Sequence, residues 1–179
     1  MKYDFETIID RTGKDALAVE DIPFPNAEVA EGFSRIPMWV ADMNFATAPV
    51  IQEHIITRAG HPTFGYYNIT DEYYNSIISW HRDRNGVTGL AKEHIGYENG
   101  VLGAVCSAMQ AFTAPGEAIL LHAPTYTGFT GVVTQNGRRI VLSERQKDAQ
   151  GIWRMDYEDM DRKLKEHKIH FAIFCSPLS

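Results

Sequence analysis

Cysteine is scarce in this 179-residue chain, and long apolar runs are absent. The two cysteines, Cys106 and Cys175, stand among apolar residues with no second cysteine nearby, which predicts reduced core thiols rather than a disulfide framework. No stretch reaches the roughly 20 apolar residues of a membrane span, and the start, MKYDFETIIDRTGKD, is too charged for a signal peptide. We therefore expect a cytoplasmic protein that does not enter the membrane.

Basic residues are also too few for a nucleic-acid surface. The formal net charge is −6 and the sequence contains no run of basic residues, which argues against binding to nucleic acid or to an anionic membrane. His167 and His170 have a ligand-like spacing, but they bridge a helix end and a strand start beside lysines. No cluster of Cys, His and Asp has the spacing of a zinc site. Motifs typical of nicotinamide binding and of a nucleophile elbow are missing. We expect no metal site and no nicotinamide cofactor.

Hydrophobic residues make up 44% of the chain, which is enough for one domain with a sizeable core. From residue 95 onward, short apolar strands alternate with helical patterns, and Gln150 and Gly151 mark a turn. This alternation predicts an α/β fold whose mostly parallel sheet is covered by helices on both faces. The expected strands cover residues 95–98, 118–122, 139–143 and 171–175, and the expected helices cover residues 101–113, 127–136 and 156–167.

Two helices are expected before this alternation begins. The first has Thr47 as its N-cap and Pro49 in its first turn, and the second spans residues 71–84 and ends at Asn85-Gly86. Apolar spacing predicts an apolar side on the first helix and one buried face on the second. The expected faces are Val50, Ile51, His54, Ile55 and Ile56 on the first helix, and Tyr73, Tyr74, Ile77, Ile78 and His81 on the second.

The stretch 98–129 (ENGVLGAVCSAMQAFTAPGEAILLHAPTYTGF) organises the rest of the chain. Gly100 separates an expected strand from a helix whose first amides have no intrahelical partner and favour an anion. The helix carries an apolar stripe, and the next strand is followed by an aromatic residue, Tyr126. An aromatic side chain beside such a helix start suits a flat phosphorylated ligand, although ordinary packing of Tyr126 is the alternative. The expected stripe consists of Val101, Leu102, Val105, Met109 and Phe112.

Ligands of parallel sheets bind beyond the carboxyl ends of the strands. On this element assignment, Gly100, residues 124–126 and Ser176 all fall at that edge. The assignment therefore predicts a ligand site there without reference to any family.

Four segments resemble one family of enzymes. Residues 36–45 (IPMWVADMNF) match a P-M-W-V-A-D-M-[DN]-F segment, residues 64–66 match F-G-Y, and residues 174–177 (FCSP) match the lead-in to an N-P-x-G loop. With the stretch 98–129, these segments resemble fold-type I pyridoxal-phosphate enzymes, and among them the MalY/PatB group of aminotransferase-like cystathionine β-lyases. The resemblance extends from residue 5 to residue 177, but it covers only the front half of such an enzyme.

The resemblance implies a three-layer α/β/α major domain of the aspartate-aminotransferase type, present incompletely. Residues 1–45 would form an N-terminal arm and part of the small domain, and residues 46–179 the first part of the cofactor-binding large domain. The arm departs from the family pattern, since residues 16–20 read ALAVE where the group has Ser-x-Lys-Trp-Asp. We assign no role to the arm for this reason.

The resemblance also implies where pyridoxal 5'-phosphate would bind. The backbone amides of Val101 and Leu102, after the turn at Gly100, would hold the phosphate, and Tyr126 would stack on the pyridine ring. Tyr66 would donate a hydrogen bond to the phosphate of a neighbouring subunit, which implies a homodimer with shared active sites. The alternative for Tyr66 is packing beneath the helices.

The loop at residues 40–42 would line the substrate side of the cofactor. In the family, backbone groups there meet the carboxylate of the amino-acid substrate, so Val40, Ala41 and Asp42 are candidate substrate-binding residues. From composition alone, Asp42 and Asn44 would simply brace a turn.

The implied chemistry is β-elimination from an L-cystathionine-like amino acid, which gives a thiol, pyruvate and ammonia. The Schiff-base lysine, the aspartate on the pyridine nitrogen and the arginine for the substrate carboxylate lie further downstream in the family. The family's asparagine beside the cofactor falls at or after Ser179, to which we assign no role. We therefore expect no catalytic residue within this chain, which alone should be inactive. A plain aminotransferase and a truncated, non-catalytic binding or regulatory protein are the alternatives.

Overall fold

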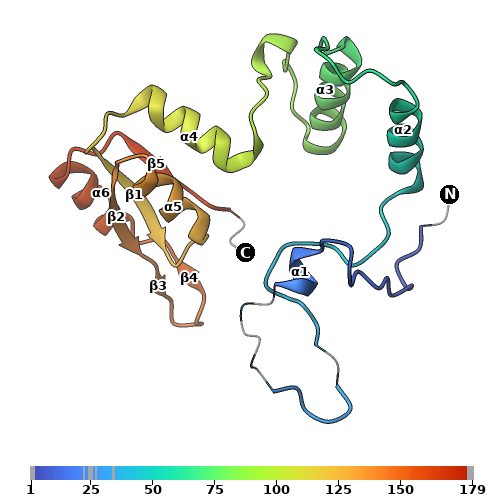
Figure 1. Ribbon diagram of the computed structural model, residues 1–179. Coiled ribbons are helices and arrows are strands. Elements are labelled where there is room, and N and C mark those ends of the chain that lie inside the picture. Colours follow the sequence, from blue (N-terminus) through green and yellow to red (C-terminus); the bar gives the residue numbers. More distant parts are fainter. Residues whose placement is uncertain (1–2, 22, 24–25, 27, 34, 177–179) are drawn as a thin grey trace. The chain divides into compact units, whose positions relative to one another are not determined.

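The computed structural model describes residues 3–21, 23, 26, 28–33 and 35–176. The chain forms two compact units, Met1–Asn68 and Ile69–Ser179 (Figure 1). The expected division into an arm with part of a small domain (1–45) and a large domain (46–179) concerns a complete enzyme and stays a prediction. Ser179 lies outside the described residues.

The second unit is built on a parallel sheet whose three described strands are β1 (Ala118–Ala123), β2 (Arg139–Glu144) and β5 (Phe171–Ile173). The order is β2-β1-β5, and Leu120 lies opposite Val141 on one side and Ala172 on the other. The central strand β1 is buried almost along its whole length, as its continuous apolar sequence predicts for a strand covered on both faces. The predicted parallel α/β fold is confirmed.

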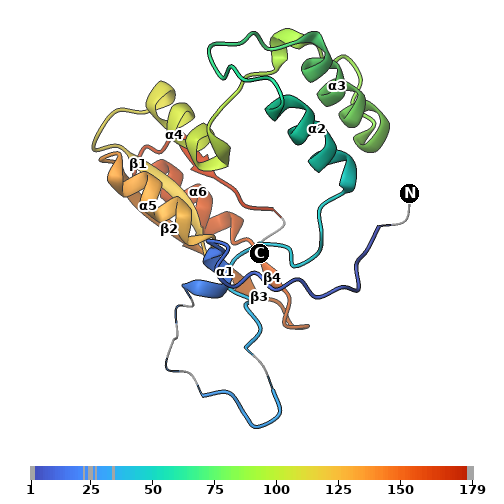
Figure 2. The same cartoon turned by 45° about the vertical axis from the view of Figure 1, so that its right-hand side comes forward.

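Helices cover both faces of this sheet, so the fold has three layers (Figure 2). Helices α4 (Gly100–Phe112) and α5 (Thr127–Gln135) pack Met109, Phe129 and Val133 against one face, which β1 supplies with Ile119 and Leu121. Helix α6 (Tyr157–Glu166) packs Met160 against the other face, beside Leu120. Alternate residues of β1 thus face opposite layers.

The predicted stripe on α4 is only partly correct. Met109 is fully buried, and Leu102 and Val105 pack against the same cluster. Val101 and Phe112 are each more than 70% exposed. Val101 lies in the first turn of α4 and borders a pocket instead of the core.

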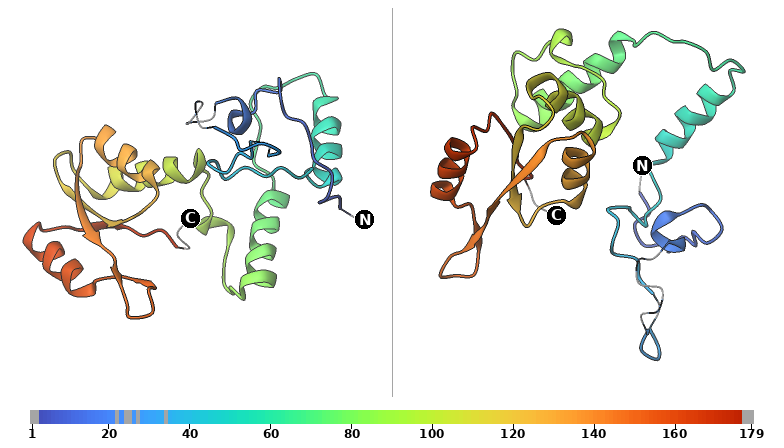
Figure 3. Two further views of the ribbon diagram at one scale, coloured as in Figure 1. Left: turned by 90° about the horizontal axis from the view of Figure 1, so that it is seen from below. Right: turned by 60° about the vertical axis from the view of Figure 1, so that its left-hand side comes forward.

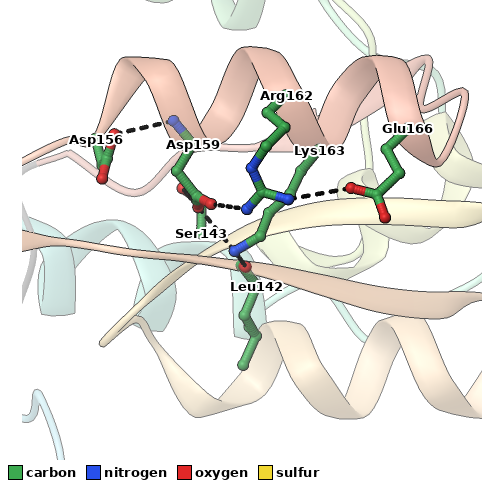
Figure 4. A network of polar contacts seen from close by, with 7 residues as sticks. All are labelled: Leu142, Ser143, Asp156, Asp159, Arg162, Lys163 and Glu166. Carbon is green, nitrogen blue, oxygen red and sulfur yellow. Dashed lines mark hydrogen bonds and ion pairs between the residues drawn. The ribbon is translucent and has the colours of Figure 1, made fainter.

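Helix α6 is attached to β2 by a polar network as well as by apolar contacts (Figure 4). Asp156 caps the helix by accepting the Asp159 backbone N–H at 2.9 Å. The Asp159 carboxylate accepts hydrogen bonds from Ser143 Oγ at 2.8 Å and Lys163 Nζ at 2.7 Å, and Lys163 also donates to the carbonyl of Leu142. The hydrogen bond from Lys163, followed by those from Ser143 and Arg162, lowers the pKa of Asp159 to about 2.

A short antiparallel ribbon of β3 (Gln146–Lys147) and β4 (Trp153–Arg154) continues from the end of β2 (Figure 3). The predicted turn lies between these strands, with Gly151 at φ +78°. Asp148 accepts the backbone N–H groups of Gln150 and Ile152 and holds the turn closed.

The predicted strand at residues 95–98 is not formed. Ile95 has an extended backbone with φ −114° and ψ 115°. Among the described residues, however, no neighbouring strand pairs with this segment. Apolar spacing predicts the extended conformation correctly, but a strand also needs a hydrogen-bonded partner.

Helix α3 (Asp71–Asn85) ends where the sequence predicts, because Gly86 adopts φ +66° in the left-handed region. A short 3₁₀ helix, η1 (Lys92–His94), follows, and Lys92 Nζ binds the carboxylate of Asp71 at 2.7 Å. The predicted buried face is wrong: within the described structure no residue of α3 is buried, and Tyr74, Ile77 and Ile78 are only half-buried.

The first unit contains α1 (Leu17–Glu20) and α2 (Pro49–Ala59). Pro49 opens α2 as predicted, but Ala48 rather than Thr47 is the N-cap, so this prediction is wrong. The apolar side of α2 is exposed, with Ile55 63% exposed. Periodicity identified the apolar face of the helix, but the described residues supply nothing for it to pack against.

Within the part of the chain that the structure describes, no helix is long and apolar enough to cross a membrane. Nor do the described His, Cys, Asp and Glu side chains form a group of three or more that is able to hold a metal ion.

Candidate functional site

A pocket of about 610 Å³ lies at the carboxyl edge of the sheet in the second unit. Strands β1 and β5 are parallel, so the segments that follow them emerge at the same edge, where α4 also begins. The sequence predicted a ligand site at this edge. Its described lining consists of Asn99, Gly100, Val101, Leu102, Tyr126, Phe129 and Cys175.

The start of α4 forms one wall of the pocket. Gly100 has φ +74°, a conformation that glycine adopts without strain, and its N–H donates to the carbonyl of Glu98 at 2.9 Å. Among the described groups, no side chain caps this helix, and the N-cap residue is Asn99. The first-turn amides of Val101 and Leu102 have no intrahelical acceptor and carry the positive end of the helix dipole. This wall therefore suits an anionic group such as a phosphate.

Tyr126 forms a second wall, between the end of β1 and the start of α5. Its side chain is 46% exposed, and its ring meets the ring of Phe129 edge to face, with centroids 5.4 Å apart and planes at 88°. A half-exposed aromatic ring opposite unpaired amides can bind a flat ring that carries a phosphate. The structure thus brings Gly100, Val101, Leu102 and Tyr126 to one pocket.

Sequence reasoning missed three lining residues: Asn99, Phe129 and Cys175. Each stood beside a recognised feature, since Asn99 precedes the glycine turn, Phe129 follows Tyr126 by one helical turn, and Cys175 follows β5. Of the described lining residues, only Tyr126 and Cys175 have ionisable side chains. The absence of a catalytic residue from this chain stays a prediction.

The other predicted site residues lie in the first unit. The N–H of Asp42 donates to the carbonyl of Val40 at 2.8 Å. The Asp42 carboxylate accepts a 2.5 Å hydrogen bond from Arg11, which also donates to Asn44 Oδ1 at 3.4 Å. Asp42 and Asn44 thus brace this turn, as composition predicts. A substrate-binding role for Val40, Ala41 and Asp42 stays a prediction.

Tyr66 is fully exposed, as its neighbours Phe64 and Tyr67 largely are. The alternative that Tyr66 packs beneath the helices is therefore wrong for this chain. Phe64 makes a cation–π contact with Arg58, whose guanidinium carbon lies 5.1 Å from the ring centroid. The predicted contact of Tyr66 with a neighbouring subunit's phosphate stays a prediction.

His122 is a buried polar residue outside the pocket lining. It is 2% exposed and, by the alternation along β1, faces the same layer as Leu120 and α6. Its Nε2 has no hydrogen-bond partner among the described atoms, and burial, followed by the charge of Arg145, lowers the pKa of the imidazole. The ring stays neutral at neutral pH and packs against Phe174, with centroids 4.8 Å apart.

Comparisons with known proteins bear on this site. The family described as aminotransferase class I and II matches residues 39–179. Cystathionine beta-lyase PatB of Bacillus subtilis (strain 168) is 34% identical over 142 residues, which is 79% of this chain and 36% of PatB. Protein MalY of Escherichia coli (strain K12) is 26% identical over 178 residues, which is 98% of this chain and 44% of MalY.

The fold is also shared with a solved structure. Cystalysin from Treponema denticola, whose crystal structure contains a pyridoxal 5'-phosphate cofactor, matches with a TM-score of 0.87 and 28% identity, over 100% of this chain and 44% of that one. The chain thus spans less than half the length of these relatives. Because the family match covers most of the sequence and includes the whole pocket, the chain belongs to the aminotransferase class I and II family.

Proposed function

We propose that this chain supplies the phosphate- and ring-binding part of a pyridoxal-phosphate site in a carbon–sulfur lyase. The observation that carries the proposal is that the unpaired α4 amides and the ring of Tyr126 line the same pocket. The solved relative cystalysin contains pyridoxal 5'-phosphate, and PatB is a cystathionine beta-lyase. The complete activity would be β-elimination from a sulfur-containing amino acid.

The four pocket residues that the sequence predicted have distinct parts in this proposal. The amides of Val101 and Leu102 hold the phosphate, and Gly100 gives the turn that presents them. Tyr126 stacks on the pyridine ring and excludes water from one side of it. When bound, the cofactor supplies an electron sink for the bond-breaking chemistry.

The first unit would contribute the residues that meet the substrate. It would also contribute Tyr66, which would reach the cofactor phosphate of the other subunit in a homodimer. Val40, Ala41 and Asp42 would meet the carboxylate of the amino acid, with Arg11 bracing the turn. The full exposure of Tyr66 leaves its hydroxyl accessible to a phosphate bound by a neighbouring subunit. We place the chain in a reducing, cytoplasmic location, which the scarcity of cysteine in its sequence favours.

Two other functions are compatible with the same pocket. The matched family includes aminotransferases, which favours transamination as the second candidate chemistry. A binding or regulatory protein that keeps the cofactor pocket without turnover is the third. Release of pyruvate and ammonia from L-cystathionine identifies the lyase, and amino transfer to a keto acid identifies the aminotransferase. Cofactor binding without either activity identifies the binding protein.

The pocket is tested by titrating the protein with pyridoxal 5'-phosphate. We expect Tyr126→Ala to weaken binding severalfold or more, because the substitution removes the stacking surface. The matched control is Tyr157→Ala, an exposed tyrosine at the start of α6 that does not line the pocket. Unchanged affinity in Tyr126→Ala, or an equal loss in both variants, would remove Tyr126 from the site.

Borohydride treatment tests whether a lysine takes part. We expect the cofactor to bind this chain reversibly, so that borohydride does not attach it covalently to one peptide. Fixation onto a single peptide would identify a lysine that holds the cofactor, and would contradict the expectation that this chain lacks one.

A further inference from the structure

The ring of Tyr126 lies directly on Gly128, in the first turn of α5. A Cβ built on Gly128 would lie 2.8 Å from Tyr126 Cζ and 3.0 Å from its Oη, and closer still to Cε1. Carbon atoms that are not bonded to each other normally stay about 3.5–4.0 Å apart. The hydroxyl end of the ring therefore occupies the space that a side chain at residue 128 would need.

The backbone does not require glycine at this position. Gly128 lies inside α5 and outside the positive-φ region, so any L-residue can adopt its conformation. Glycine within a helix is unfavourable relative to alanine, because it loses more conformational entropy on folding. The contact with Tyr126 is thus the feature of the structure that a larger residue would disturb.

We propose that Gly128 is a positioning residue for Tyr126. The missing side chain lets the phenol ring lie against the first turn of α5, where Phe129 meets it edge to face. Gly128 and Phe129 together set how far the ring stands over the pocket. A methyl group at residue 128 would push the ring away from α5 and change the width of the pocket between Tyr126 and the start of α4.

The consequence for ligand binding rests on the proposed function. Stacking depends on the plane and the height of the ring, so a displaced ring would hold the pyridine less well. We expect Gly128→Ala to lower the affinity for pyridoxal 5'-phosphate severalfold. In a Tyr126→Ala background the same substitution should have no further effect, because the ring that it displaces is gone.

Gly131→Ala is the matched control. Gly131 lies in the same helix, and the nearest described atom to its added Cβ would be Gln135 Nε2, at an ordinary 3.9 Å. Both substitutions replace a helical glycine by alanine, so both change helix propensity in the same way. Of the two substitutions, only Gly128→Ala would place a methyl group that clashes with the ring of Tyr126.

The position of the ring is measured directly by NMR of the full chain with ¹³C-labelled tyrosine, in which Tyr126→Phe identifies the Tyr126 signal. The proposal expects this signal to shift in Gly128→Ala and to stay in place in Gly131→Ala. A signal that does not move in Gly128→Ala overturns the proposal, whatever the ligand does. A shifted signal combined with the same cofactor affinity as Gly131→Ala overturns the positioning role.

Titration with pyridoxal 5'-phosphate separates this inference from the proposed function. If the unsubstituted chain does not bind the cofactor, the proposed function fails, and the NMR signal alone then decides whether Gly128 positions the ring. If the unsubstituted chain binds and Gly128→Ala binds severalfold less tightly than Gly131→Ala, with the Tyr126 signal shifted, both hold.

Discussion

The two units of this chain use their apolar residues in opposite ways. Among the described residues, the buried apolar side chains of the first unit are Ala16 and Ala18, while the second unit buries residues 119–121 of β1 completely. The first unit nevertheless contains the most specific sequence segment, residues 36–45. In that segment Ile36, Met38 and Met43 are each more than 70% exposed. The segment that resembles the family most specifically therefore leaves these apolar side chains exposed.

This difference has a physical cause. The second unit has a strand with helices on both sides, so each apolar residue of β1 meets a partner within the same chain. The first unit has two short helices and long connections, and most of its large apolar side chains are exposed. Burial of apolar area is the main source of stability, so the second unit should be the stable part of the chain.

The largest effect is expected from truncation in the core of the second unit. Leu120→Ala removes a fully buried side chain from the centre of β1 and should lower the free energy of unfolding by about 2–5 kcal/mol. Ile55→Ala, on the exposed side of α2, should change it by no more than about 0.5 kcal/mol. Urea unfolding followed by circular dichroism measures both. Equal losses in the two variants would contradict the contrast between the units.

An intermediate effect is expected at the helix starts. Asp156 caps α6 with a hydrogen bond to the Asp159 N–H, so Asp156→Ala should lower the free energy of unfolding by about 1 kcal/mol. Thr47 is not the N-cap of α2, so Thr47→Ala should leave the free energy of unfolding almost unchanged. The same urea titration compares them. A loss in Thr47→Ala as large as in Asp156→Ala would restore Thr47 as a cap.

A smaller effect is expected in acid. Folding lowers the pKa of Asp159 from 3.8 to about 2, because Lys163, Ser143 and Arg162 donate hydrogen bonds to the carboxylate. The stability that this carboxylate contributes is therefore fully present above pH 3.8 and is lost as the pH falls through about 2. Asp159→Asn should flatten the fall in melting temperature between these pH values. Parallel curves for the variant and the unsubstituted chain would show that Asp159 does not contribute.

Much of the second unit could be predicted from the sequence. The apolar run of β1, the left-handed Gly86 and the turn at Gly100 are local signals, and each appears in the structure where the sequence places it. The pocket followed from topology, because parallel strands bring Gly100 and Tyr126 to the same edge. These features depend on residues close in sequence or on a rule of chain connection.

The features that the sequence did not predict depend on contacts between distant residues. Spacing identifies the apolar face of α2 but does not say whether anything covers it, and the face is exposed. Cys175 reaches the pocket through the pairing of β5 with β1. The hydrogen bond from Ser143 to Asp159 joins a strand to a helix across 16 positions of sequence, and no local pattern indicates it.

The polar network of α6 also affects the position of the helix along the sheet. Met160 and Leu164 lie four residues apart on the same side of α6 and contact the same apolar cluster. Apolar contact is non-directional, so a slide of about 6 Å along the helix axis would place one of these side chains where the other had been. The Ser143–Asp159 and Lys163–Leu142 hydrogen bonds would break in such a slide. These two hydrogen bonds therefore help to fix the position of α6 along the sheet.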